Sequence, residues 1–156
     1  MKDLLLFRHA QAGGGSVTGR DFDRVLTEFG RSQPEGAGRA LVEQGASPQL
    51  VLCSASARTR ETLALLQASG LCDGAELRYS EALYECTVRQ ILLELAGVDD
   101  AIERVMLVGH NPGLSDLATG LTRHSVGLSP GDYAWLRFEG EWASVEAQAA
   151  QLYLRS

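Results

Sequence analysis

The stretch LLLFRHAQ (residues 4–11) places four consecutive apolar residues directly before an arginine and a histidine. A short apolar run that ends in polar and turn residues is typical of a fully buried strand in a parallel sheet. Three glycines at positions 13–15 follow closely and indicate a loop. The stretch therefore predicts a buried strand that delivers Arg8 and His9 to a loop at its carboxyl end.

Two further apolar runs end in the same way. Residues 50–53 (LVLC) lead through small residues to Arg58, and residues 105–108 (VMLV) lead to Gly109 and His110. Both runs have the length and the boundaries of buried strands. The chain is thus expected to contain three core strands, each followed by a nitrogen-rich side chain.

Helices are expected between these strands, within 27–44, from Arg58 to a stop at Gly70, over 88–96 and over 114–121. Thr27 is one candidate cap of the first helix, and Ser32 with Glu35 in a capping box is the other. A strand at 76–79 and an antiparallel hairpin turning around Gly140 complete the pattern. This alternation predicts an α/β protein, a three-layer α/β/α sandwich with a mostly parallel, mixed central sheet.

Length and composition set limits on the class of protein. The chain has 156 residues, 45% hydrophobic and 22% charged, which suits a single domain over 1–156 with a real core. A net charge of -6 argues against a nucleic-acid partner. The three cysteines show no C-x-x-C spacing and favour reduced thiols in the cytoplasm. Residues 4–7 are too short an apolar run for a signal peptide or a membrane span.

The carboxyl ends of parallel strands meet at one edge of a sheet, where α/β proteins build their binding sites. We therefore expect four side chains to lie together there: Arg8, His9, Arg58 and His110. Arginines and histidines crowded in this way repel one another unless an anion lies among them. The planar guanidinium fork matches two phosphate oxygens, and helix N-termini nearby add backbone N–H donors. The pattern predicts a site for a phosphoryl group.

Four segments resemble, in order, the marker segments of the histidine phosphatase superfamily: LLLFRHAQA (4–12), DRVLTEFG (23–30), LVLCSASARTRETL (50–63) and VMLVGHNPGLSDLA (105–118). The likeness is to its short, SixA-type branch of phosphohistidine phosphatases, whose members lack large cap insertions. The resemblance implies a phosphoglycerate mutase-like fold and a phosphatase that uses no metal or other cofactor.

Position by position, the resemblance implies that His9 is the nucleophile and that Arg8, Arg58 and His110 hold the phosphoryl oxygens. A neutral ring nitrogen of His9 would attack phosphorus, and water would then hydrolyse the phosphohistidine enzyme. The arginines would stabilise charge on the equatorial oxygens. Ala10 stands where many superfamily members have glycine.

Larger relatives also supply a carboxylic acid that protonates the leaving group. Glu81 and Glu85 are the nearest candidates, and a solvated helix entry explains both equally well. A missing acid suits phosphohistidine, because its imidazole can carry its own proton near neutral pH. The expected substrate is a phosphohistidine protein that reaches an open, shallow mouth. Small phosphate esters hydrolysed by the same mechanism are the alternative.

The segment CSASART (53–59) raises a different hypothesis, a cysteine-dependent phosphatase. Such loops place five residues between the cysteine and the arginine, whereas only four separate Cys53 from Arg58 here. Because the cradle is one residue short and lacks glycine, a buried strand residue is the preferred interpretation of Cys53.

Two more hypotheses involve no phosphoenzyme. A non-catalytic module could bind phosphorylated partners through the same four side chains. A metal site on His9 and His110 lacks any H-x-H, H-x-x-x-H or clustered cysteine spacing.

The remaining polar residues are expected outside the site. Arg20 and Arg24 are interpreted as solvated loop charges, with the lining of the site entrance as the alternative. His124 is interpreted as a surface residue. Asn111 is a candidate cap for the helix that follows it. The simplest alternative for Arg58 is an ion pair with Glu61 on the same helix face.

Overall fold

The computed structural model describes residues 1–156 and contains six strands, four α-helices and three 3₁₀ segments. The strands are β1 (Lys2–Arg8), β2 (Leu50–Ser54), β3 (Glu76–Ser80), β4 (Arg104–Gly109), β5 (Tyr133–Phe138) and β6 (Gln151–Arg155). The helices are α1 (Glu28–Glu43), α2 (Ala57–Ala68), α3 (Val88–Ala96) and α4 (Gly113–Thr122). The 3₁₀ segments are η1 (Asp21–Asp23), η2 (Glu81–Leu83) and η3 (Trp142–Ala147).

All strands form one sheet in the order β3-β2-β4-β1-β5-β6. The first four are parallel, and β5 and β6 each run antiparallel to the preceding neighbour. The register pairs Arg8 with Gly109 and Cys53 with Val108, so β1, β2 and β4 end at the same edge. The mostly parallel, mixed sheet expected from the sequence is confirmed.

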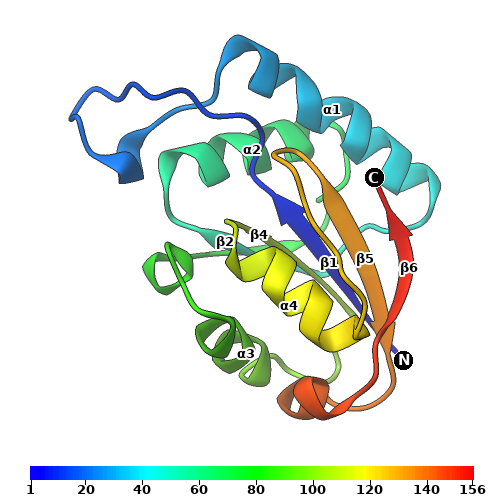
Figure 1. The fold of residues 1–156 in the computed structure, drawn as a ribbon. Helices are drawn as coiled ribbons and strands as arrows, with labels where there is room; N and C mark the ends of the chain where they lie inside the picture. The colour runs from blue at the N-terminus through cyan, green and yellow to red at the C-terminus, as the bar shows by residue number, and fades with distance from the viewer.

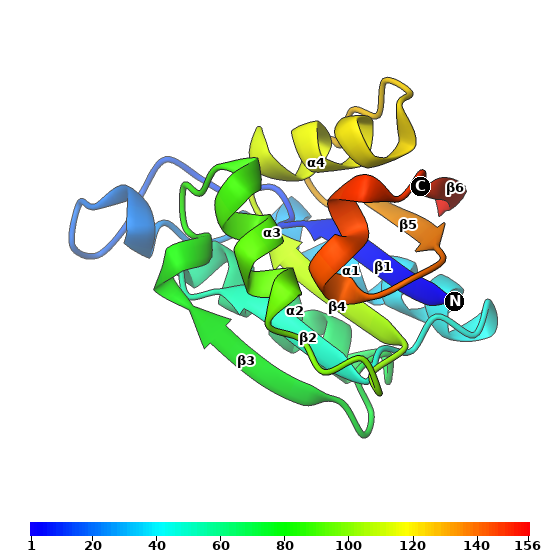
Figure 2. The same cartoon turned by 90° about the horizontal axis from the view of Figure 1, so that it is seen from below.

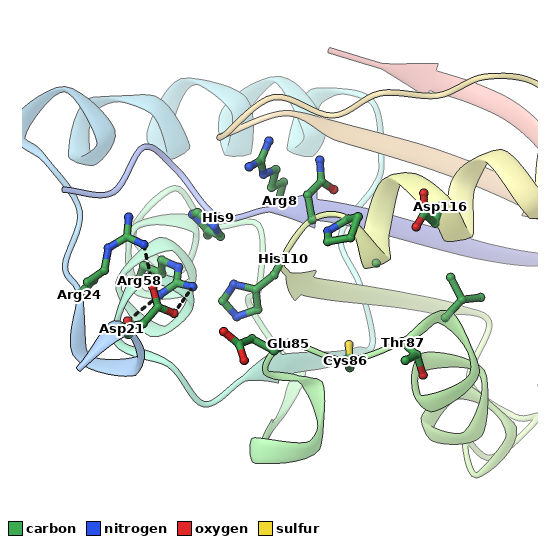
Figure 3. A pocket seen from close by; sticks show the side chains of 14 residues that line it. Arg8, His9, Asp21, Arg24, Arg58, Glu85, Cys86, Thr87, His110 and Asp116 are labelled. Carbon is green, nitrogen blue, oxygen red and sulfur yellow. Dashed lines mark hydrogen bonds and ion pairs between the residues drawn. The ribbon is translucent and has the colours of Figure 1, made fainter. Parts of the chain in front are cut away.

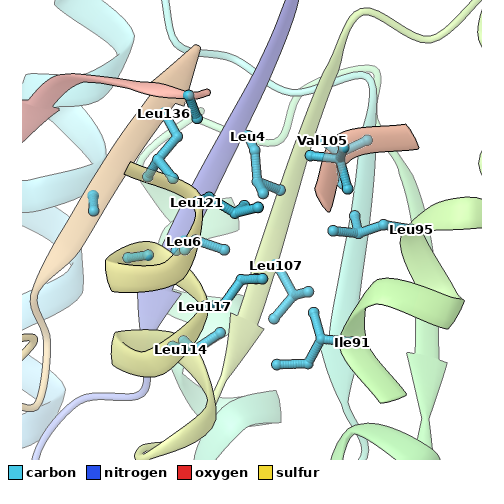
Figure 4. Packing of buried hydrophobic residues seen from close by; sticks show 14 of the residues in the cluster. Leu4, Leu6, Ile91, Leu95, Val105, Leu107, Leu114, Leu117, Leu121 and Leu136 are labelled. Atoms are coloured by element: carbon cyan, nitrogen blue, oxygen red, sulfur yellow. The ribbon is translucent and has the colours of Figure 1, made fainter. Parts of the chain in front are cut away.

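Helices cover both faces of the sheet (Figures 1 and 2). Alternate residues of β1 serve the two sides: Leu4 and Leu6 join the core under α3 and α4, and Leu5 and Phe7 join the core under α1 and α2. Figure 4 shows the first of these cores, with Leu114 of α4 packed toward the strands. Burial on both faces explains why β1 reads as an unbroken apolar run rather than an alternation. The three-layer arrangement is confirmed.

The starts of α1 and α3 follow local capping chemistry. Thr27 caps α1, where its hydroxyl accepts the Gly30 N–H at 2.9 Å, so the Ser32 alternative is wrong. Thr87 and Gln90 form a complete capping box at the start of α3. No helix of the protein is both long enough and apolar enough to cross a membrane.

The hairpin expected around Gly140 differs from the structure. β5 and β6 do pair antiparallel, but η3 lies between them and the returning strand begins only at Gln151. Trp142 and Val145, spaced by three residues, both bury their side chains in the core beside α3 and α4. A spacing of three suits a helical turn, and this burial outweighed the apparent alternation of the segment.

Candidate active site

A cleft of about 690 Å³ opens at the carboxyl edge of the parallel strands. All four predicted site residues line it, namely Arg8, His9, Arg58 and His110 (Figure 3). His9, Arg58 and His110 are each at most 8% exposed and form its floor, whereas the rim residues Glu85 and Asp116 are exposed. The structure thus brings together residues that lie as far apart as positions 8 and 110.

His9 follows β1 directly, and its backbone N–H is bonded to the Gly109 carbonyl at 3.0 Å. Its Nδ1 lies 2.7 Å from the Ala10 carbonyl oxygen. Because a carbonyl can only accept, Nδ1 carries the proton and Nε2 keeps its lone pair. Burial, together with the positive charges of Arg58 and Arg8, lowers the pKa of His9 to about 4. The ring is therefore neutral near pH 7.

His110 occupies the equivalent place after β4, and its ring centroid lies 5.2 Å from that of His9. Its Nε2 contacts the Ser54 hydroxyl at 2.8 Å and the Ser56 hydroxyl at 3.3 Å. Nδ1 is buried without a hydrogen-bond partner. Burial and the Arg58 charge lower the pKa of His110 to about 3. A second neutral imidazole with an unused nitrogen thus lies beside the first.

Arg8 and Arg58 bring two guanidinium groups to the same cleft. Arg8 donates from Nη1 to the Leu128 carbonyl at 2.8 Å, and its Nε is buried without a partner. Arg58 lies in the first turn of α2, where it is 6% exposed. Two guanidinium groups in one cleft, next to a helix N-terminus, form an environment that favours an anion.

The alternative ion pair between Arg58 and Glu61 is wrong. Glu61 instead contacts Arg31 at 2.8 Å and accepts the Leu26 N–H at 3.0 Å. These contacts join α1 and the segment before it to α2. Arg58 remains directed toward the cleft.

Asp21 is a cleft residue that sequence reasoning missed. It accepts from Arg58 Nη2 at 3.1 Å and from Arg24 Nη1 at 2.8 Å, and the Tyr84 hydroxyl donates to the same carboxylate. Hydrogen bonds from Tyr84 and Arg24 lower the pKa of Asp21 far below its ordinary value. Burial and the Asp21 carboxylate raise the pKa of Tyr84 to about 12. No sequence spacing marked this contact, because its partners lie 37 and 63 positions away.

Arg24 also lines the cleft, so the alternative of an entrance residue is confirmed for it and the solvated loop charge is wrong. Its Nε donates to the Gly13 carbonyl at 2.7 Å, which folds the loop back on itself. Arg20 does remain on the surface, paired with Asp23 at 2.9 Å.

The two acid candidates are placed differently. Glu85 lines the cleft, with a backbone φ of 50° and its carboxylate turned toward His110 in Figure 3. Glu81 is exposed in η2 and is absent from the cleft lining. Asp116, in the first turn of α4, is a further lining carboxylate that the sequence analysis did not single out.

The remaining residues lie where packing or capping explains them. Cys53 is fully buried on the α1–α2 side of the sheet, and burial raises the pKa of its thiol to about 12. The N-cap of α4 is Pro112 rather than Asn111, although Asn111 Oδ1 accepts the Ser115 N–H at 3.2 Å from one residue earlier. His124 is exposed. No three His, Cys, Asp or Glu side chains come together as a metal-binding group.

Comparisons with known proteins agree with this geometry. The model of the histidine phosphatase superfamily (branch 1) matches residues 4–91. An uncharacterised chloroplastic protein of Arabidopsis thaliana is 30% identical over 152 residues, covering 89% of this chain and 68% of that protein. An uncharacterised protein of Mycobacterium leprae is 30% identical over 142 residues, covering 85% of each chain.

Solved structures resemble the whole chain. A protein provisionally named phosphohistidine phosphatase SixA from Nakamurella multipartitia is 34% identical, with a TM-score of 0.87 over 99% of this chain and 95% of that one. A protein given the same provisional name from Agrobacterium tumefaciens is 25% identical, with a TM-score of 0.85 over 99% and 97%.

Proposed function

Because the chain belongs to the histidine phosphatase superfamily (branch 1), we propose that it hydrolyses phosphohistidine on a protein through a covalent phosphohistidine intermediate, without a metal. The single observation that carries the mechanism is the tautomer and neutral state of the His9 ring. Its Nδ1 proton is held by the Ala10 carbonyl, which leaves a neutral Nε2 lone pair at the buried floor of a cationic cleft. A neutral imidazole nitrogen is a competent nucleophile toward phosphorus.

In the first step, His9 Nε2 attacks phosphorus as the bond from phosphorus to the leaving imidazole nitrogen breaks. The departing nitrogen keeps the electron pair of the broken bond. It leaves as part of a neutral imidazole, because the other ring nitrogen of the substrate already carries a proton near neutral pH. Arg8, Arg58 and His110 stabilise the equatorial oxygens during the transfer. This step needs no separate general acid.

In the second step, water attacks the phosphorus of phosphorylated His9. The bond from phosphorus to Nε2 breaks, the ring recovers its lone pair, and both protons of the water leave with the released phosphate. The same guanidinium groups stabilise both transition states, since both steps transfer the same phosphoryl group at the same place.

The rim of the cleft supports a protein substrate. The reactive nitrogen lies at the floor, whereas Glu85, Thr87, Pro112 and Asp116 around it are exposed. A phosphorylated side chain that projects from a protein surface can enter from this open side. The provisional name of the 34% identical structure from Nakamurella multipartitia points to the same substrate class.

The decisive experiment compares wild type, His9→Ala and His124→Ala on a phosphohistidine protein and on a sugar phosphate, following phosphate release. His124 is the matched control, because it is an exposed histidine outside the cleft. We expect wild type and His124→Ala to hydrolyse the phosphohistidine protein and His9→Ala to be inactive. Equal activity of His9→Ala would refute the mechanism, and activity on the sugar ester alone would refute the substrate class.

Phosphate release alone does not show that a phosphoenzyme forms, so the phosphoenzyme is measured as well. Rapid quenching at alkaline pH, followed by mass spectrometry, is expected to show one phosphoryl group on the peptide that carries His9. Binding of the phosphohistidine protein with no release and no phosphopeptide would instead identify a non-catalytic phosphate-binding module.

A further inference from the structure

We propose that Asp21 is a positioning residue that holds Arg58 in the orientation needed to bind the phosphoryl group. This inference rests on the proposed function, because Asp21 would act through Arg58. Two hydrogen bonds join the pair: Arg58 Nη1 donates to the Asp21 backbone carbonyl at 2.8 Å, and Nη2 donates to the carboxylate at 3.1 Å. Together they bind one side of the planar guanidinium group, and the donors not used here remain for an anion.

Arg58 needs such a partner. Its buried guanidinium lines the same cleft as those of the half-buried Arg8 and Arg24, and these like charges repel one another. A long, flexible side chain would relieve this repulsion by turning away from the site. The Asp21 carboxylate opposes that movement and offsets part of the positive charge.

Asp21 is itself held from two directions. On its own loop, the Gly13 N–H donates to the Val25 carbonyl at 3.0 Å, and Arg24 Nε donates to the Gly13 carbonyl. These two hydrogen bonds close the base of the loop. From the segment after β3, the Tyr84 hydroxyl donates to the carboxylate, and the Tyr84 ring packs edge-on against Phe22 with centroids 5.0 Å apart. Figure 3 shows Asp21 between Arg24 and Arg58 at one side of the cleft. The carboxylate is therefore part of a fixed scaffold.

Asp23 provides a matched control within the same 3₁₀ segment. Its carboxylate accepts from Thr18 at 2.5 Å and from Arg20 at 3.0 Å, and it does not line the cleft. Asp21→Asn and Asp23→Asn remove the same charge from positions two residues apart. Only the first touches Arg58.

The test is a double-mutant cycle of Asp21→Asn with Arg58→Lys, measured as kcat/KM on a phosphohistidine protein. Lysine keeps the positive charge at position 58 but lacks the fork that Asp21 holds. We expect Asp21→Asn to lower kcat/KM about tenfold in the wild-type background and less than about twofold in the Arg58→Lys background. Asp23→Asn is expected to leave kcat/KM unchanged. Equal losses in both backgrounds would refute action through Arg58.

Binding of inorganic phosphate, measured by calorimetry, distinguishes positioning from a pure charge effect. If Asp21 only neutralised part of the positive charge of the cleft, Asp21→Asn would tighten phosphate binding. Positioning predicts the opposite, a dissociation constant about threefold or more higher. Tighter binding would refute the proposal. This measurement needs no turnover, so it remains informative even if wild type fails to hydrolyse phosphohistidine and the proposed function is wrong.

Tyr84→Phe provides an independent variant in case Asp21→Asn does not fold. It removes only the hydroxyl that donates to Asp21 and keeps the ring against Phe22. We expect a loss of kcat/KM of about threefold that disappears in the Arg58→Lys background. A loss of the same size in both backgrounds would contradict the scaffold.

Discussion

At two glycines of α1, Gly30 and Gly36, we expect substitution by alanine to change the stability in opposite directions. An added Cβ at Gly30 would lie 2.0 Å from the Gln11 carbonyl oxygen and 2.9 Å from the Gln11 carbonyl carbon. An added Cβ at Gly36 would meet no atom within 4 Å. Both residues lie in the same helix, so alanine gains similar helix propensity at each position. The difference between the two variants therefore isolates the clash with Gln11.

The magnitudes follow from these contacts. Alanine in place of glycine in a helix gains about 1 kcal/mol, and Gly36→Ala should gain that amount in full. At Gly30 the obstructing atoms are backbone and cannot rotate away, so overpacking costs about 3 kcal/mol. Gly30→Ala should then lose a net of about 2 kcal/mol in the free energy of unfolding. For a chain of this size, a gap of about 3 kcal/mol between the variants corresponds to roughly 6–12 °C in Tm.

Urea unfolding with a fixed m-value, supported by thermal melts, measures this gap. Gln11 lies two residues after His9, so Gly30→Ala is also expected to lower phosphatase activity, whereas Gly36→Ala should not. Wild-type stability of Gly30→Ala would show that the loop yields freely and would refute the close packing of α1 on the loop after β1. A loss of stability in Gly36→Ala would refute the propensity argument.

Three further predictions concern charge and the thiol. Since burial lowers the pKa of His9 to about 4 and of His110 to about 3, the unfolded chain binds more protons below about pH 6.5. The free energy of unfolding is therefore highest above that pH and decreases as the pH falls toward 4. His9→Gln should reduce this dependence of the unfolding free energy on pH, measured by urea titrations. Asp3 bridges Arg104 at 3.0 Å and Arg137 at 2.7 Å, so Asp3→Asn should cost about 2 kcal/mol in urea unfolding; an unchanged midpoint would contradict the bridge. Cys53→Ser should keep turnover, because the thiol faces the core rather than the cleft; an inactive variant would restore the cysteine mechanism.

Local sequence was sufficient for the floor of the site. The apolar runs of β1 and β4 lead within two residues to Arg8, His9 and His110, whereas that of β2 leads through residues 54–57 to Arg58 in the first turn of α2. Parallel pairing aligns the ends of these strands at one edge. Because both the burial of a strand and the position of its end are encoded by neighbouring residues, Arg8, His9, Arg58 and His110 could be named before the structure was known.

The sequence by itself determined the four parallel strands, the helices between them and the four nitrogen-bearing side chains of the floor, because periodicity and strand ends are properties of adjacent residues. Only the tertiary structure decided the walls of the cleft. Asp21 meets Arg58 and Tyr84 across 37 and 63 positions, and Trp142 turns inward in η3 to complete the core. Such contacts depend on which segments the sheet brings together. No local pattern of charge or hydrophobicity encodes a contact between residues so far apart in the sequence.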